Sequence, residues 1–174
     1  MAETWWRRLA RLRVPLGFAA GVLVLWLATP TWGLLAIGTA VALAGEGFRV
    51  WAAGHLEKSR EVTRSGPYRW SRHPLYVGSA LMGVGVAIAG NSAIAAVAIC
   101  LYIVVTMAAA IRTEEAFLRS KFGPEYDEYC RGASRAPDRL FSFARAWRNR
   151  EYRAVLGMGA VFAILALKVF LARG

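Results

Sequence analysis

The sequence has few of the residues that bind metal ions or form covalent cross-links. Its 174 residues include only two cysteines and two histidines. Cys100 lies in an apolar run and Cys130 in a charged segment. No spacing of cysteine and histidine matches a zinc site. We therefore expect neither a disulfide nor a bound metal.

Charged residues are absent or rare in several long stretches. Hydrophobic residues make up 57% of the chain, which is above the roughly 45–50% of soluble domains. The runs between the charge clusters approach the roughly 20 apolar residues with which a helix crosses a bilayer. The sequence predicts an all-α integral membrane protein with about five transmembrane helices. The expected spans are residues 14–28, 32–53, 74–90, 93–111 and 154–172.

Acidic residues are half as frequent as basic ones, 11 against 22, and the formal net charge is +11. The basic residues lie between the apolar runs, as they do in the cytoplasmic loops of membrane proteins. We therefore expect no nucleic-acid partner. The turns after the first and third spans carry no Lys or Arg, whereas the other connecting segments are rich in both. This alternation predicts a cytoplasmic N-terminus and cytoplasmic polar segments, and the short loops favour a bacterial inner membrane.

No small-residue cleavage site follows the first apolar run, which predicts a retained first helix. No internal repeat is visible. We expect a single domain over residues 1–174. Its core is expected at 55–129, followed by a basic interfacial segment at 130–153 and a last transmembrane helix at 154–172.

Three charge patterns carry local predictions. Glu46 and Arg49 lie one turn apart near the end of the second span, so they can pair on one helix face. Glu114 and Glu115 follow the fourth span, and we expect them in the first turn of a new helix, where negative charge suits the helix dipole. The segment DRLFSFARAWRNR is expected to be an interfacial helix that anchors the chain. Its apolar side chains at helical spacing are Leu140, Phe143, Ala144 and Trp147.

The segment GPYRWSRHPLYVG, residues 66–78, is polar and stiff although apolar runs surround it. Pro67 and Pro74 restrict the backbone, and Pro74 suits the first turn of the third span. Alone, the segment is typical of an interfacial belt of aromatic and basic residues. The third and fourth spans form a hairpin, however, so His73 and Glu114 must emerge on the same side. That arrangement favours a pocket for a ligand with separated charges. The segment's charged and aromatic residues are Tyr68, Arg69, Trp70, Arg72, His73 and Tyr76.

The third span is rich in glycine, with Gly78, Gly83, Gly85 and Gly90. Small residues let membrane helices approach closely. The glycines therefore indicate either helix packing or room for a ligand against the backbone, and the sequence leaves both interpretations open.

Residues 66–78, together with EEAFLRSKFGPEYDEY at 114–129, resemble the isoprenylcysteine carboxyl methyltransferase family and its phospholipid methyltransferase relatives. The resemblance covers about residues 55–129. After Tyr129 the chain reads RGASRAPDRLF, where the family often has a Val-Pro-Arg-like stretch. This departure leaves the acceptor and the membrane anchoring open.

The resemblance implies S-adenosylmethionine as cofactor, bound on the cytoplasmic side. It also implies catalytic roles for Arg112, which would hold an acceptor carboxylate, and for Glu114, which would pair with positive groups of the cofactor. A carboxylate acceptor is already a nucleophile, so it needs positioning rather than a strong base. The residues expected to contact the cofactor are His55, Val62, Thr63, Tyr68, Arg72, His73, Pro74, Leu75, Tyr76 and Glu114.

The expected function is carboxyl methylation of a prenylated cysteine or a similar lipophilic acceptor, with membrane lipids as the surroundings. Three alternatives stay open. One is a phospholipid amine N-methyltransferase, because a histidine is available as a base. Another is an NADPH-dependent reductase of the related sterol reductase type. The third is a non-catalytic membrane module.

Overall fold

The computed structural model describes residues 2–132 and 139–172. All secondary-structure elements within these residues are helices. This confirms the predicted all-α class. The helices are α1 (Ala2–Leu27), α2 (Trp32–His55), the 3₁₀ helix η1 (Gly66–Arg69), α3 (Pro74–Gly90), α4 (Ala93–Phe122), α5 (Pro124–Cys130), α6 (Phe143–Arg148) and α7 (Tyr152–Leu171).

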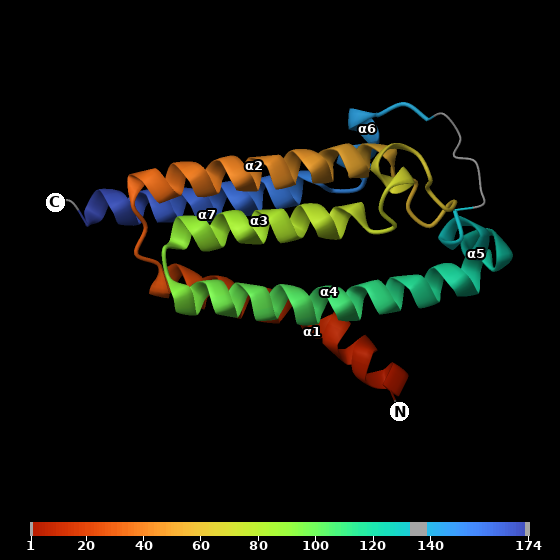
Figure 1. Ribbon diagram of the computed structural model, residues 1–174, viewed down its shortest axis with the longest axis horizontal. Helices are drawn as coiled ribbons and strands as arrows, with labels where there is room; N and C mark the ends of the chain where they lie inside the picture. Colours follow the sequence, from red (N-terminus) through yellow and green to blue (C-terminus); the bar gives the residue numbers. More distant parts are fainter. Residues whose placement is uncertain (1, 133–138, 173–174) are drawn as a thin grey trace.

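The apolar helices α1, α2, α3, α4 and α7 run side by side as an elongated bundle (Figure 1). Helices α2, α3 and α7 form one group, and α1 packs along α4 beside it. Helices α2, α4 and α7 are long and apolar enough to cross a membrane, while α3 and the apolar part of α1, Pro15–Leu27, are shorter. All five lie where the sequence predicts apolar spans, and the protein is an integral membrane protein.

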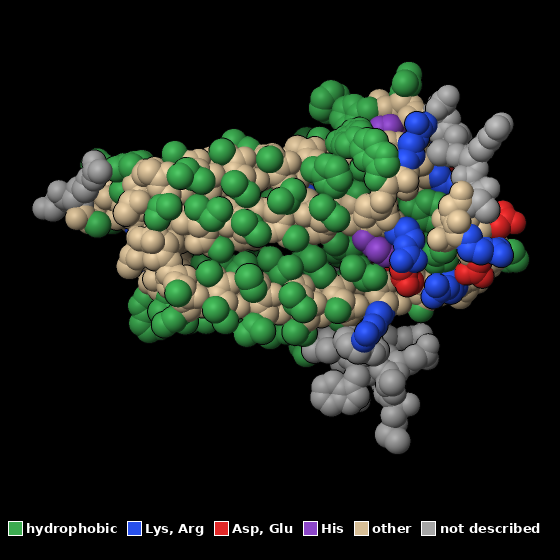
Figure 2. Space-filling model, viewed as in Figure 1, with side chains coloured by type: hydrophobic (Ala, Val, Ile, Leu, Met, Phe, Trp, Pro, Cys, Tyr) green, Lys and Arg blue, Asp and Glu red, His purple; other side chains and the backbone are tan. Residues whose placement is uncertain are grey.

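The surface fits a lipid environment. Phe18, Trp26 and Ile94 are each more than two-thirds exposed on the sides of the bundle. Figure 2 shows hydrophobic side chains along the length of the helix bundle and charged side chains gathered at one of its ends. We call this the charged end; it holds residues 56–73, 112–132 and 139–153. The opposite end, with the two short turns, is the turn end.

The turn end is held by short polar contacts. Ser92 caps α4 by accepting a hydrogen bond from the backbone of Ala95 at 3.3 Å. Asn91 has the left-handed φ of +48° that a tight turn requires. Lys168 of α7 donates to the carbonyls of Leu25 and Ala28, each at 2.7 Å. These carbonyls lie at the C-terminal end of α1, where they have no hydrogen-bond donor within the helix, and the lysine supplies one.

Glycines bring α2 and α3 into close contact. A Cβ on Gly45 would lie 2.7 Å from the carbonyl oxygen of Gly78, and Gly38 meets Gly85 in the same way. Gly78 and Gly85 therefore serve helix packing, which confirms one of the two interpretations of the glycine-rich span. Gly83 packs against Ile99 and Ile103 of α4 and also lines a cavity, so room for a ligand stays a prediction at that residue.

Two expectations for the charged segments are wrong. Glu114 and Glu115 do not start a new helix, because α4 continues without a break to Phe122. No proline or glycine interrupts it before Gly123, whose φ of +50° ends the helix. At 30 residues, α4 is about 45 Å long, which exceeds the roughly 30 Å of a hydrocarbon core. Its last turns therefore extend beyond the apolar layer.

The expected interfacial helix is also shorter than predicted, since α6 covers only Phe143–Arg148. Ser142 caps its first turn by accepting a hydrogen bond from the backbone of Arg145, so Leu140 precedes the helix. Leu140, Phe143 and Trp147 are nevertheless at least 68% exposed, as side chains that enter a membrane interface would be.

Candidate active site

The connector between α2 and α3 covers residues 56–73, and its central part, residues 62–68, is buried or half-buried. Pro67 and Tyr68 lie in the 3₁₀ turn η1 and are buried. His73 is the N-terminal cap residue of α3, and Pro74 occupies the first turn of that helix, as predicted. Since proline needs no hydrogen-bond partner there, the connector enters α3 without an unsatisfied backbone donor at that position.

A histidine, an arginine and a glutamate meet at the start of α3. His73 Nε2 lies 3.1 Å from a carboxylate oxygen of Glu115. A guanidinium nitrogen of Arg72 lies 3.4 Å from the same oxygen. We call His73, Arg72 and Glu115 the charged triad. It joins the connector to α4, which is the juxtaposition that the sequence predicts.

The glutamate in this contact is Glu115, whereas the sequence analysis placed Glu114 opposite His73. Glu114 is exposed and lies on a neighbouring face of α4, because successive residues of an α-helix are about 100° apart. Its charge acts on Tyr68 instead: burial raises the pKa of the Tyr68 hydroxyl, and the Glu114 carboxylate raises it further. Arg112 is exposed on α4, one turn before Glu115.

A second tyrosine fixes the connector from α5. The Tyr129 hydroxyl donates to the carbonyl of Tyr68 at 2.8 Å. Burial raises the pKa of Tyr129 to about 12. Both tyrosines therefore keep their protons at neutral pH. The sequence analysis did not single out Tyr129, although its position in the second motif was a usable signal.

His55 is the last residue of α2, Val62 and Thr63 lie within the connector, and all three are buried. His55 Nδ1 is 3.1 Å from the hydroxyl of Ser65. A Cβ on Gly66 would lie 2.6 Å from the His55 ring, so only glycine allows the connector to pack there. His55 thus supports the connector directly.

Ion pairs hold residues 56–65 from two sides. Arg64 pairs with Glu125 of α5 at 2.8 Å. Arg145 of α6 pairs with Glu57 at 3.0 Å. Asn149 donates to the carbonyls at the end of α2. The segment at 139–150, which the sequence predicts only as a membrane anchor, therefore also holds the connector in place. This role depends on contacts between residues about 90 positions apart in the sequence.

Arg49 links α2 to the start of α3, but the expected pair with Glu46 does not form. Arg49 pairs with Glu151, which precedes α7. It also donates to the carbonyl of Leu75 at 3.2 Å and to the Ser79 hydroxyl. Glu46 is buried, and its carboxylate has no hydrogen-bond partner among the described residues. Arg49 instead turns toward α3 and α7, which places a charge directly behind the first turn of α3.

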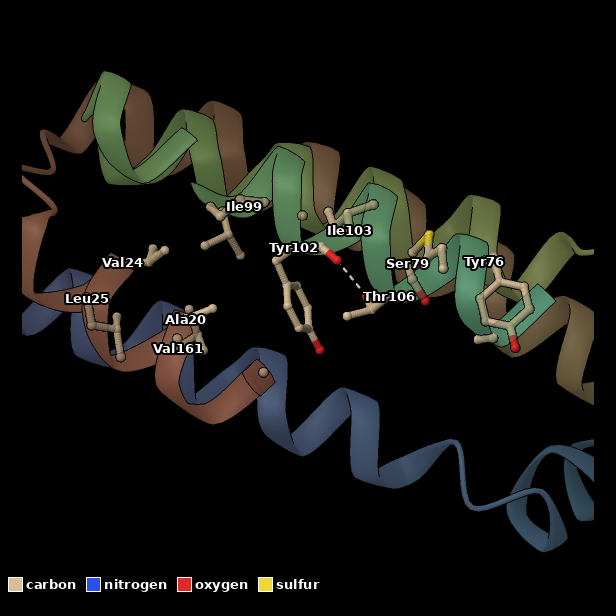
Figure 3. A pocket seen from close by; sticks show the side chains of 16 residues that line it. Ala20, Val24, Leu25, Tyr76, Ser79, Ile99, Tyr102, Ile103, Thr106 and Val161 are labelled. Carbon is tan, nitrogen blue, oxygen red and sulfur yellow. Dashed lines mark hydrogen bonds between the residues drawn. The ribbon is translucent and has the colours of Figure 1, made fainter. Parts of the chain in front are cut away.

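A cavity of about 360 Å³ opens between α1, α3, α4 and α7 (Figure 3). This volume lies in the range of small-molecule sites. Most of its lining is apolar, and its hydroxyl groups come from Tyr76, Ser79, Tyr102 and Thr106. Figure 3 shows Tyr76 and Ser79 at one end and Val24, Leu25 and Ile99 at the other.

Tyr76 connects the cavity to the charged triad. Its side chain lines the cavity, and its ring centroid is 5.9 Å from that of His73. Of the other predicted residues, Pro74 and Leu75 form the first turn of α3 just beside this junction. Ala110, two residues before Arg112, also lines the cavity. The structure thus places a polar site and an apolar cavity end to end.

In the described part of the chain, no group of three or more His, Cys, Asp or Glu side chains could hold a metal ion.

Comparisons with known proteins agree with the two motifs. The phospholipid methyltransferase family matches residues 15–125. A probable protein-S-isoprenylcysteine O-methyltransferase of Oryza sativa is 36% identical over 90 residues, which are 52% of this chain and 47% of that protein. The protein-S-isoprenylcysteine O-methyltransferase of Schizosaccharomyces pombe is 29% identical over 106 residues, 58% of this chain and 45% of that protein. These matches confirm the family resemblance.

A cobalt-zinc-cadmium resistance protein of Cupriavidus metallidurans is 36% identical over 97 residues, 55% of this chain and 43% of that protein. The matched part therefore spans less than half the length of each of these relatives. No solved structure matches the chain.

Proposed function

Because this chain belongs to the phospholipid methyltransferase family, we propose that it is an S-adenosylmethionine-dependent methyltransferase that acts on a lipophilic acceptor. The preferred acceptor is the carboxylate of a prenylated cysteine. The observation that carries the proposal is the position of Tyr76, which belongs to the apolar cavity and also lies against His73 of the charged triad. A lipid chain in the cavity would present its polar end at the triad.

The residues at the connector suit this cofactor. The amino-acid portion of S-adenosylmethionine carries a carboxylate and an ammonium group. Arg72 and His73 offer donors to the carboxylate, and Glu115 and the exposed Glu114 offer acceptors to the ammonium group. When bound, the cofactor supplies a methyl group on a positively charged sulfur.

The chain's own residues position the acceptor and exclude water. The apolar lining of the cavity holds the lipid chain. Arg112 is the expected partner of an acceptor carboxylate, which it would hold by charge-assisted hydrogen bonds. It is exposed on α4 and lies about 200° round that helix from the cavity-lining Ala110, so this role rests on the family motif and not on the cavity. Holding the two reactants close together in this way lowers the activation free energy of methyl transfer, by about 7 kcal/mol or more in well-oriented systems. The charged end faces the cytoplasm, and the membrane is a bacterial inner membrane.

One observation favours amine methylation as a second candidate. His73 Nε2 contacts the Glu115 carboxylate at 3.1 Å, and a histidine oriented by a carboxylate can accept a proton. An ethanolamine lipid would need this help, because its amine must be neutral when it attacks. A carboxylate acceptor would not need it.

A transfer assay separates these functions. Membranes containing the protein are supplied with methyl-labelled S-adenosylmethionine and either a farnesylated cysteine analogue or an ethanolamine lipid. Base-labile label on the farnesylated analogue supports the carboxyl methyltransferase. Stable label on the ethanolamine lipid supports the second candidate instead. Absence of transfer to either acceptor, with no cofactor binding, would refute both and favour a non-catalytic module.

A further inference from the structure

We propose that Tyr102 determines the length of the lipid chain that the cavity accepts. This inference rests on the proposed function, because it concerns the acceptor of that reaction. It assigns a specificity-determining residue that neither sequence motif contains, since Tyr102 precedes the second motif by more than three turns of α4.

Tyr102 lies part-way along the cavity. The cavity follows α3 from Tyr76 to Val86, which corresponds to about 15 Å of helix. In Figure 3 the Tyr102 ring stands between the hydroxyl-bearing end, with Ser79 and Thr106, and the apolar end, with Val24 and Ile99. A chain that enters at Tyr76 therefore meets the Tyr102 ring before it reaches the apolar end.

Tyr102 also approaches α1 closely. A Cβ on Gly17 would lie 2.6 Å from the Tyr102 hydroxyl oxygen and 3.3 Å from the ring carbon that bears it. The side chain therefore crosses from α4 to α1, and glycine at position 17 makes room for its tip. The ring therefore lies across part of the cavity between α4 and α1, and a lipid chain that extends past it must run alongside the ring.

The lining beyond the ring is apolar. It includes Val24, Leu25, Ile99 and Val161, which all line the same cavity. Such a lining would stabilise additional apolar carbons if the ring were removed. The cavity therefore continues beyond Tyr102, and the ring narrows the passage to its apolar end. We infer that the protein uses the shorter prenyl chains and discriminates against longer ones.

The test compares acceptors that differ only in chain length, namely geranyl, farnesyl and geranylgeranyl cysteine analogues. In Tyr102→Ala, the ratio of kcat/KM for geranylgeranyl over farnesyl should rise at least about tenfold, since a misfit of one methylene is already worth about 10–200-fold. In Tyr102→Phe the ring remains, so the wild-type ratio should persist. Equal ratios in wild type and Tyr102→Ala would overturn the inference while leaving the methyltransferase function intact.

A second variant keeps the inference testable if Tyr102→Ala does not fold. Gly17→Ala should push the tyrosine further into the cavity and lower the farnesyl over geranyl ratio, and adding Tyr102→Phe should restore it because the clashing oxygen is removed. The absence of any change in Gly17→Ala would contradict the proposal.

Stabilisation of the protein by each acceptor, measured by thermal unfolding without cofactor, reports binding independently of methyl transfer. Chain-length-dependent stabilisation that shifts in these variants would support the role of Tyr102 even if no methyl transfer occurs, in which case only the proposed function fails.

Discussion

Replacing Glu115 with glutamine removes the negative charge that His73 and Arg72 share, while the shape of the side chain is kept. The Glu115 side chain is 20% exposed and lies 3.1 Å from His73 and 3.4 Å from Arg72. A hydrogen bond that involves a charged group contributes about 1.5–3 kcal/mol. The pair with the more exposed Arg72 adds no more than about 1 kcal/mol. Without this charge, the contacts of His73 and Arg72 with α4 are weakened, although Arg72 keeps its contact with Cys130 and His73 its contact with Ser71.

We expect Glu115→Gln to weaken binding of S-adenosylhomocysteine by about 2 kcal/mol, which corresponds to about 30-fold in Kd. Isothermal titration calorimetry of the purified protein in detergent measures this change. The matched control is Glu128→Gln, because Glu128 is an exposed glutamate on α5. Cofactor binding that is unchanged in Glu115→Gln, or reduced equally in both variants, would refute the role of the charged triad.

Two further predictions concern the helix contacts and the connector. Gly45→Ala should lower the stability of the protein by about 1–3 kcal/mol, because an added methyl group would lie 2.7 Å from the Gly78 carbonyl oxygen. Thermal unfolding measures this change. Gly47→Ala is the control, since a Cβ on Gly47 would have nothing within 4 Å. Equal stability of the two variants would contradict the close packing of α2 on α3. Tyr129→Phe should lower stability by about 1 kcal/mol at neutral pH, because the hydrogen bond to Tyr68 is lost. In the wild-type protein, burial raises the pKa of Tyr129 to about 12, against an ordinary value of 10. The contribution of the neutral hydroxyl to stability is therefore complete below pH 10 and is lost as the pH rises toward 12. The variant should therefore lose less stability than wild type over that interval, and identical alkaline unfolding curves would count against the assignment.

The helix boundaries show which parts of the fold can be predicted from sequence. The bounds of α3 agree with the predicted span because Pro74 and the turn at Asn91 are local signals. The predicted span ends at residue 111, whereas α4 continues 11 residues further, to Phe122. Charged residues end an apolar run but do not end a helix, so a prediction based on hydropathy finds the membrane boundary and misses the helix boundary.

The candidate site shows the same division between local and distant information. The motif predicts that His73 and an acidic residue of α4 meet, and they do. Which of Glu114 and Glu115 makes the contact depends on the rotation of α4 about its own axis, which packing against other helices determines. The ion pair of Arg49 with Glu151 joins residues about 100 positions apart, and no local pattern indicates it.

The cavity could not be predicted from the sequence. Its walls come from four helices, and each contributes a few residues that are ordinary in a membrane helix. Within one glycine-rich span, Gly78 packs against α2 while Gly83 lines the cavity. This difference depends on which face of α3 each residue occupies relative to its neighbours, and that is known only from the assembled bundle.

The central claim is that a lipid acceptor occupies the cavity with its polar end at Tyr76. Photo-crosslinking tests it most directly, with a farnesylcysteine analogue that carries a photoreactive group at its polar end, in the presence of S-adenosylhomocysteine. Mass spectrometry of the cross-linked peptides should find the label at the start of α3 and the adjoining turns of α4, near Tyr76 and Thr106. Labelling confined to the lipid-facing surfaces of α2 and α7, unaffected by an excess of unlabelled farnesylcysteine, would contradict the account.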